Sequence, residues 1–365
     1  MSRVVINLYP VSKGGGLQNS LSFLNFLSDD SRKNKVIVLV REGTLLEKSC
    51  KDNNINYFSI KDSIIGRLMV EFYLARRISK FFEADVFFTL FGNTPLFKPH
   101  CPSVSGFAFS NIIESDVNFW GFLPLHEKAF KKLKDIMRLY LSKRSDSIIL
   151  ETEHLKKIAE VNKTFGFTRL HVVKMAPSSI LSELYKLPNI KKRKVKKILY
   201  LSGPHQNKNI HKLADVFRYD PDLLLYTTLP KCTYLNNVVK SFEVYGISKQ
   251  LINLGPVSPD KIPDVISSVD AMVNVATLES FSNNWVEAWA SKRLLIAVDE
   301  KYARASCNDA AVYIDLSEGE KSAKAIKSAF FNVEKYLENG VNELKRLPSP
   351  KERYNKFWSV IYESI

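Results

Sequence analysis

Short apolar runs alternate along the chain with longer segments whose apolar residues recur every three or four positions. Residues 17–27 and 68–82 have this helical spacing, whereas the short runs have the length and composition of buried strands. In the first half, the predicted strands are residues 4–8, 36–40, 86–90, 147–150 and 170–173. The alternation restarts near residue 190, with predicted strands at 198–201, 223–226, 251–254, 271–275 and 294–298. Strands that alternate with helices indicate parallel sheets with helices on both faces.

The two alternating blocks predict two Rossmann-like domains that face a cleft. The chain has 365 residues, which is long enough for two domains of roughly 150 residues, each with its own core. We expect the first domain at 1–188 and the second at 189–348. Residues 349–365 carry Phe357 and Trp358 on one apolar helical face, so we expect a final helix that packs on the body of the protein.

The composition is that of an ordinary globular protein. Hydrophobic residues make up 45% and charged residues 25%, which excludes disordered and fibrous classes. No apolar run approaches the roughly 18 residues that cross a bilayer, and the first residues lack the pattern of a secretory signal. The four cysteines form no C-x-x-C pair, so we expect neither a zinc site nor a disulfide framework, and a reducing cytoplasm.

The formal charge is +15, and much of the excess lies in residues 126–144 and 191–197. The first segment also has apolar residues at helical spacing, so it predicts a helix with one apolar and one basic face. Such a helix can lie on an anionic membrane surface, or it can pack on its own domain with its lysines in water. The membrane contact would be made by Lys128, Lys131, Lys132, Lys134 and Arg138.

The second basic segment, 191–197, has the composition of a nucleic-acid patch, but it runs directly into the strand at 198–201. A solvated linker at the start of a domain fits this position better. The positive charge also suggests a separate hypothesis, namely that the protein binds nucleic acid. It is disfavoured because the basic runs lack interleaved aromatic residues and no binding module is visible.

Two loops that follow predicted strands have the composition of phosphate sites. Gly14, Gly15 and Gly16 follow the first strand and precede a helix, an arrangement that lets the backbone approach an anion, although a flexible turn is the alternative. Gly203 and Lys208 follow the strand at 198–201. We expect Lys208 in the first turn of a helix, where the helix dipole disfavours a cation. A bound anion would offset this unfavourable interaction. The alternative is that the Lys208 side chain points to water.

The third loop is the most specific. Glu279 follows the strand at 271–275, and Asn283 or Asn284 is expected to cap a helix that carries Glu287. Carboxylates accept hydrogen bonds from hydroxyls, so this pair suits a sugar and a ribose, and the amides between them suit a diphosphate. The alternative is that Glu287 is an ordinary first-turn acid and Glu279 a solvent contact.

Glu279 and Glu287, with seven residues between them, resemble the Glu-x7-Glu signature of retaining GT-B glycosyltransferases, in particular family four and its bacterial surface-polysaccharide members. Residues 254–258, 269–273 and 304–313 resemble the segments around that signature. The second half of the chain matches well, whereas the first half matches mainly at its glycine loop.

The resemblance implies an α/β GT-B fold whose C-terminal helix crosses back to the N-terminal domain. The N-terminal domain would hold the acceptor and the C-terminal domain a nucleotide sugar. Glu287 would bind the donor ribose, Glu279 the sugar hydroxyls, and Lys208 the leaving diphosphate. The remaining donor-binding positions would be Phe281, Ser282, Asn283, Asn284, Gly203, Gly15 and Gly16. Neither a metal nor another cofactor is implied.

The chain departs from the family pattern before the lysine, where the family has Gly-Arg and this chain has Gly203 and Pro204. His205 is not a permanent cation at neutral pH, so either another arginine, such as Arg293 or Arg304, replaces the family arginine or phosphate binding is weaker. Ser282-Asn283-Asn284 stands where the family has Gly-Leu-Pro, which predicts a changed sugar preference. In the first domain His100 matches no family position, and Ser110 and Asn111 lie where a site loop would be.

These observations predict a cytoplasmic enzyme, peripheral on the inner face of the cell membrane. It would transfer a hexose or N-acetylhexosamine, with retention, from a UDP-sugar or, next, a GDP-sugar. The acceptor would be a lipid-linked oligosaccharide or a lipopolysaccharide O-antigen. An isomerase or hydrolase of nucleotide sugars is the alternative within the same fold.

Overall fold

The computed structural model describes residues 2–177, 181–188, 190 and 194–365, and these fall into two compact units. Unit 1 comprises Met1–Asp116, Leu123–Ser178 and Pro348–Ile365. Unit 2 comprises Val117–Phe122 and Ser179–Leu347. The predicted boundary between residues 188 and 189 stays a prediction, because 189 and 191–193 lie outside the described residues.

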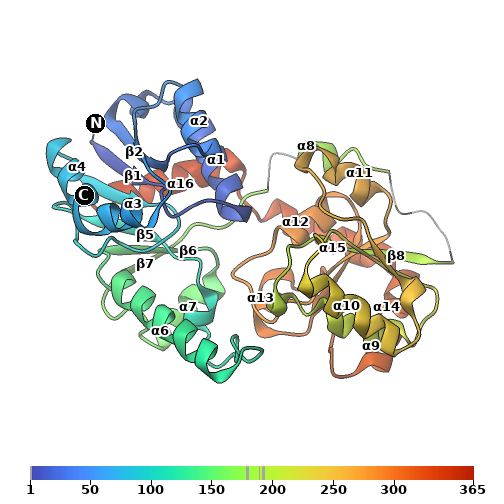
Figure 1. The fold of residues 1–365 in the computed structure, drawn as a ribbon. Coiled ribbons are helices and arrows are strands. Elements are labelled where there is room, and N and C mark those ends of the chain that lie inside the picture. The colour runs from blue at the N-terminus through green and yellow to red at the C-terminus, as the bar shows by residue number, and fades with distance from the viewer. Residues whose placement is uncertain (1, 178–180, 189, 191–193) are drawn as a thin grey trace. The chain divides into compact units, whose positions relative to one another are not determined.

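Unit 1 is built on a seven-stranded parallel sheet with the order β3-β2-β1-β4-β5-β6-β7 (Figure 1). Its strands are β1 (Val4–Asn7), β2 (Val36–Arg41), β3 (Tyr57–Ile60), β4 (Val86–Thr89), β5 (Ser103–Gly106), β6 (Ser147–Leu150) and β7 (Arg169–Val172). The five strands predicted in this half are confirmed. The sequence pattern missed β3, whose first three residues are exposed at the sheet edge, and β5, which contains one large apolar residue.

Helices cover both faces of this sheet. Side chains of β1 alternate: Val4 and Ile6 pack in one core with α1, α2 and α16, whereas Val5 packs in another with the α3–α4 segment. The helical elements of unit 1 are α1 (Gly14–Ser28), η1 (Ser31–Lys35), α2 (Leu45–Asp52), α3 (Ile64–Met69), η2 (Val70–Leu74), α4 (Ala75–Phe81), α5 (Ser110–Ile113), α6 (Leu125–Ser142), α7 (Glu153–Val161) and α16 (Pro350–Tyr362). The predicted helix at 68–82 begins already at Ile64 and contains a π-helical turn, η2.

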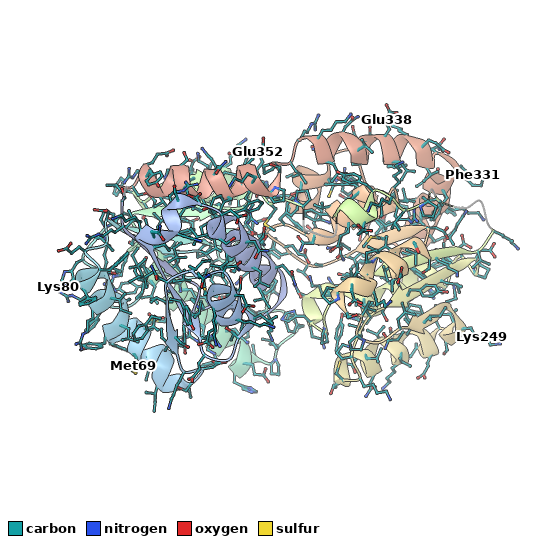
Figure 2. The ribbon with its side chains drawn as sticks, turned by 90° about the horizontal axis from the view of Figure 1, so that it is seen from above. Met69, Lys80, Lys249, Phe331, Glu338 and Glu352 are labelled. Carbon is teal, nitrogen blue, oxygen red and sulfur yellow. The ribbon has the colours of Figure 1, made fainter. Side chains whose placement is uncertain are left out.

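The final helix, α16, returns to unit 1, as predicted. Ser349 and Glu352 form a capping box at its start, where Figure 2 labels Glu352. Tyr354, Phe357 and Trp358 enter the same core as β1 and α1. The chain therefore closes its first unit with its last residues.

Unit 2 contains a six-stranded parallel sheet with the order β10-β9-β8-β11-β12-β13. Its strands are β8 (Lys196–Tyr200), β9 (Leu223–Thr227), β10 (Leu251–Asn253), β11 (Ala271–Asn274), β12 (Leu294–Val298) and β13 (Val312–Ile314). Its helical elements are α8 (Leu181–Leu184), η3 (Gln206–Lys208), η4 (Ile210–Lys212), α9 (Leu213–Phe217), α10 (Thr233–Val244), η5 (Ser248–Gln250), η6 (Pro259–Lys261), α11 (Ile262–Ser267), α12 (Asn283–Ala290), α13 (Lys301–Cys307), α14 (Gly319–Phe331) and α15 (Val333–Lys345). The five strands predicted here are confirmed. The expected linker at 191–197 is partly strand, because β8 starts at Lys196, and residues 191–193 lie outside the described part.

Each sheet has one point at which the strand order reverses. In unit 2 this point lies between β8 and β11, and in unit 1 it lies between β1 and β4. Ligands of open parallel sheets bind beyond the carboxyl ends of the strands at such a point. The predicted fold class of two Rossmann-like α/β domains is confirmed. Within the described residues, no helix combines the length and apolarity needed to cross a membrane.

Candidate functional site

The loops that follow β8 and β11 bring Lys208 and Glu279 together at the switch point of unit 2. The Lys208 ammonium forms an ion pair with Oε1 of Glu279, and both side chains are largely buried. Lys208 does not lie in the first turn of an α-helix, as expected, but at the end of the short turn η3, and α9 begins only at Leu213. The conflict with a helix dipole therefore does not arise, and neither side chain is a simple solvent contact.

Hydrogen bonds fix these two loops against each other. Asn209 adopts a left-handed conformation with φ +53°, which asparagine tolerates better than most residues. Its Nδ2 donates to the carbonyl of Val275 at 3.0 Å and to Oγ1 of Thr277 at 2.9 Å. The amide of Thr277 donates to the carbonyl of Asn207 at 2.7 Å. The backbone that carries Lys208 is thus tied to the backbone that leads to Glu279.

Asn274, the last residue of β11, connects the acidic loop to the start of α12. Its Nδ2 donates to Oγ of Ser282 at 2.6 Å and lies 3.4 Å from Oε2 of Glu279, while its Oδ1 accepts from the amide of Ala276 at 3.2 Å. The side chain is buried. Asn274 was not among the site residues predicted from the sequence. The available signal was a polar residue at the carboxyl end of an otherwise apolar strand.

The start of α12 differs from the prediction. The N-cap is Ser282, and no side chain caps the helix, whereas Asn283 is the first helical residue. Asn284 instead donates through Nδ2 to the carbonyl of Leu201 at 2.9 Å, which joins α12 to the loop after β8. The first amides of α12 therefore have no side-chain cap, and they lie next to the Glu279 loop. Amides in this position favour an anion.

Glu287 is a buried acid in the second turn of α12, so it is not the first-turn acid of the alternative interpretation. Its side chain is nearly inaccessible, and Oε2 has no hydrogen-bond partner within the described structure. Burial raises the pKa of this carboxyl from its usual value near 4.5 to about 7. A buried, unpartnered carboxylate oxygen costs free energy unless a ligand supplies a donor.

Close packing surrounds α12 in the core of unit 2. Gly340 of α15 allows close approach, because a Cβ there would lie 2.6 Å from Cδ1 of Trp289. Phe281 packs edge-on against Trp285 with ring centroids 5.3 Å apart, so its ring anchors the loop in the core of unit 2. The functional part of Phe281 in the predicted site would therefore be its backbone.

The predicted glycines have different environments. Gly203 lies on the surface of unit 2, and a Cβ added there would meet no atom within 4 Å. Gly15 and Gly16 lie in unit 1, in the first turn of α1, beyond the carboxyl end of β1. That helix also lacks a side-chain cap. The structure thus links Lys208, Glu279 and Ser282 through hydrogen bonds in unit 2 and places Glu287 in the second turn of the helix that follows Ser282, and it places the glycine loop at the corresponding point of unit 1.

The two candidates for the missing family arginine have different environments. Arg293 is buried and donates to the carbonyls of Ile266 at 3.1 Å and Ser291 at 2.8 Å. Arg304 pairs with Asp299. Arg293 is therefore committed to structural contacts, whereas Arg304 is half-exposed, and its role in place of the family arginine stays a prediction.

His205 belongs to an aromatic cluster that was not predicted from the sequence. Residues 117–122 belong to unit 2, and within them Phe119 stacks near the His205 ring at 6.3 Å while Phe122 meets it edge-on at 5.8 Å. Trp120 packs against Phe119 at 4.7 Å. The signal was the run Phe-Trp-Gly-Phe, which places three aromatic residues just before the basic helix.

The other first-domain positions have local partners. His100 accepts a hydrogen bond from Nε of Arg76 at 2.9 Å. Ser110 begins α5, and Asn111 donates to Asp135 of α6 at 2.7 Å. These contacts all lie within unit 1, and none of them identifies a ligand.

The basic helix α6 does not bury its large apolar side chains on its own unit, as one of the two alternatives expected, and the membrane alternative stays a prediction. Its polar side faces the unit, where Asp135 pairs with Arg138 at 2.8 Å and the Arg138 guanidinium lies 4.3 Å from the ring centroid of Phe109. Its large apolar side chains are exposed, namely Leu125, Phe130, Leu133, Ile136, Met137 and Tyr140. The helix therefore shows both apolar and basic groups to its surroundings.

No protein-family model matches the chain, and no curated protein matches it in sequence. The fold, in contrast, is shared with solved structures over the full length. A glycosyltransferase from Rickettsia africae ESF-5 superposes with a TM-score of 0.74 at 14% identity, covering 99% of this chain and 98% of that chain.

Two further structures show the same likeness. HepE from Anabaena in complex with UDP-glucose has a TM-score of 0.72 at 14% identity, with all of both chains covered. WaaG, a glycosyltransferase involved in lipopolysaccharide biosynthesis, has a TM-score of 0.69 at 12% identity, covering 98% of this chain and 99% of that chain. At these identities the likeness establishes the fold, which is the GT-B fold predicted from the sequence.

Proposed function

We propose that the protein is a retaining glycosyltransferase that uses a nucleotide-diphosphate sugar, with a UDP-sugar favoured and a GDP-sugar next. The transferred group is a hexose or an N-acetylhexosamine. The observation that carries this proposal is the buried carboxylate of Glu287, with an unpartnered oxygen, on the helix whose start is linked through Asn274 to Glu279 of the Lys208–Glu279 ion pair. The GT-B fold of the solved glycosyltransferases supports it.

In this proposal Glu287 holds the ribose of the donor. A ribose has two neighbouring hydroxyls, and each can donate to a carboxylate oxygen. A donor to Oε2 of Glu287 removes the penalty of an unsatisfied buried acceptor. Binding of the hydroxyls also favours the charged form of a group whose pKa burial has raised to about 7.

Lys208 and the first amides of α12 receive the diphosphate. Negative charge develops on the β-phosphate as the bond to the sugar breaks, and positioned donors stabilise that charge. When Lys208 turns to the phosphate, Glu279 loses its ion-pair partner and accepts hydrogen bonds from the sugar hydroxyls. We propose that these groups suffice without a metal ion, so that excess EDTA leaves the rate unchanged.

The acceptor is proposed to be a lipid-linked oligosaccharide or a lipopolysaccharide O-antigen at the inner face of the cell membrane. Lys128, Lys132 and Lys134 on α6 would attract anionic lipid headgroups. Arg138 contributes less, because Asp135 already pairs with it. Lys131 completes the basic set predicted from the sequence.

The test is transfer from radiolabelled UDP-, GDP- and dTDP-sugars to a lipid extract. We compare the wild type with Glu279→Gln, and use Glu338→Gln, an exposed position on α15, as the matched control. The proposal predicts labelled lipid product with retained anomeric configuration for the wild type and the control, and a strongly reduced yield for Glu279→Gln. Free sugar or an isomerised nucleotide sugar as the sole product would contradict the proposed transfer. It would indicate that the enzyme is a hydrolase or an isomerase instead.

A further inference from the structure

A long surface of unit 1 leaves apolar side chains in water. The continuous helix α3–η2–α4 buries one narrow stripe, which includes Val70, Leu74 and Ala75. On its outer side, Ile64 and Ile65 are 81% and 71% exposed. The outer set, together with one residue from the following loop, is called the α3 face here and consists of Ile64, Ile65, Leu68, Met69, Phe72, Tyr73 and Phe97.

Figure 2 shows that Met69 and Lys80 lie on the outer edge of unit 1. Phe97 belongs to the face because its ring meets that of Phe72 at 5.3 Å and its amide donates to the carbonyl of Glu71 at 2.8 Å. The face is therefore a packed surface formed by two segments. Monomeric soluble proteins rarely expose contiguous apolar patches of this kind without a binding role.

The loop that carries Phe97 also connects this face to α6. The amide of Leu96 donates to the Glu71 carboxylate at 2.9 Å, and the carbonyl of Leu96 accepts from the Arg144 guanidinium, just beyond the end of α6. The exposed apolar residues of α6 thus belong to the helix that borders the same loop. Two helices with exposed apolar side chains flank one short segment.

Cations surround the α3 face, and the nearby acids are neutralised or buried. The exposed basic residues on this helix and at its start are Lys61, Arg67, Arg76, Arg77 and Lys80. Asp62 pairs with Arg41 at 2.7 Å. Glu71 is mostly buried and binds the Leu96 amide, and burial raises its pKa. The surface around the apolar residues is therefore strongly positive.

An apolar helical face with a basic border fits the interface of an anionic bilayer, where apolar side chains enter the acyl boundary and cations meet the headgroups. We propose that the α3 face inserts into an anionic lipid bilayer and holds unit 1 on it, with α6 against the same bilayer. This inference goes beyond the proposed function, because it assigns lipid insertion to residues outside α6. It does not depend on glycosyl transfer.

The experiment measures co-flotation of the full chain with vesicles of phosphatidylcholine alone and of phosphatidylcholine mixed with phosphatidylglycerol. The test variant is Ile64→Ser/Ile65→Ser, and the control is Leu45→Ser, an exposed leucine on α2, which packs against the opposite side of the sheet. We expect the wild type and the control to float with anionic vesicles only, and the double variant to bind at least tenfold more weakly. Equal binding of the double variant would overturn the proposal.

Three further measurements keep the result interpretable. Thermal unfolding must show that the double variant is as stable as the wild type, which we expect because both side chains are exposed. The variant Ile65→Trp places a fluorescent probe on the α3 face. If the face inserts into the bilayer, the fluorescence that this tryptophan adds should shift to the blue, and doxyl-labelled lipid should quench it. The absence of both effects would contradict insertion. Sedimentation of the wild type without vesicles must show a monomer. If the wild type instead forms a dimer and does not bind vesicles, and the double variant is a monomer, the face would be assigned to contact with a second copy of the chain.

Discussion

Lys208 and Glu279 form an ion pair although they lie 71 positions apart in the chain. The pair exists because β8 and β11 are neighbours in the sheet, so the loops that follow them meet at the point where the strand order reverses. Removing one partner leaves the other charge without its counter-ion in a largely buried place. The pair is therefore a sensitive point for both stability and the proposed chemistry.

Replacing Lys208 by methionine should lower kcat by about two to three orders of magnitude, the loss that follows removal of one donor to a developing charge. Lys208→Arg should restore part of the rate, because it keeps the cation. Steady-state kinetics at saturating donor measure both values. The control is Lys212→Met, an exposed lysine in the neighbouring turn. A Lys208→Met enzyme with the kcat of the wild type would remove Lys208 from the mechanism.

Glu287 should make the protein less stable as the pH rises. The carboxyl has a pKa near 4.5 when unfolded and about 7 when folded, so the folded state binds the proton more tightly. The stabilisation is fully present below pH 4.5 and is lost as the pH rises through 7. The loss approaches roughly 3 kcal/mol above pH 7, since each pH unit of difference corresponds to about 1.4 kcal/mol.

Glu287→Gln has no carboxyl that can titrate at this position. Its free energy of unfolding should therefore rise relative to that of the wild type between pH 5 and pH 8. Urea unfolding at several pH values measures the difference. The same variant should fail in transfer, so that a gain in stability accompanies a loss of function. Parallel stability curves for the two proteins would show that Glu287 is not the perturbed group.

Asn274→Ala should separate positioning from stability. The variant loses the donor to Ser282 and to Glu279, and leaves buried partners unsatisfied, at a cost of about 1–3 kcal/mol. Asn253→Ala is the matched control, because Asn253 also ends a strand and bonds to Thr227 and Leu229. Urea unfolding should show both variants destabilised, whereas kinetics should show a reduced kcat only for Asn274→Ala. Equal kcat values would make Asn274 purely structural.

Trp358→Ala should destabilise unit 1 by about 3–5 kcal/mol, the usual cost of truncating a large buried aromatic residue. Trp358 is 1% exposed, packs near Phe23, and has the Arg32 guanidinium 4.6 Å from its ring centroid. Denaturant unfolding followed separately for the two units should show the shift in unit 1 alone. A change below about 1 kcal/mol would mean that α16 contributes little to that core.

The sequence predicted the strands well where large apolar residues are consecutive, as in β1 and β12, because a strand buried on both faces needs them. It missed β5, whose serines and glycine are buried between neighbouring strands and leave no apolar run. The period of three to four residues in α6 was read correctly, but which side of that helix faces the unit depends on Asp135 and its partners, which periodicity does not reveal.

The placement of Lys208 and Glu279 at one edge of the sheet was predictable, because each of them follows a strand of the same parallel sheet. The roles of these residues and of Glu287 stay predictions. The contacts within the candidate site could not be predicted from the sequence. Whether Asn283, Asn284 or Ser282 caps α12 depends on the competing bond from Asn284 to the carbonyl of Leu201. That bond joins loops that are distant in the chain, so local sequence gives no signal for it.

The donor-binding role of Glu287 is tested most directly by calorimetric titration of UDP, GDP and dTDP into the wild type and into Glu287→Gln at pH 8. We expect the wild type to bind at least one of these nucleotides, and the variant to bind it at least tenfold more weakly, a difference of about 1.4 kcal/mol or more. Equal affinity of the two proteins, or no binding of any of the three nucleotides to the wild type, would contradict this role.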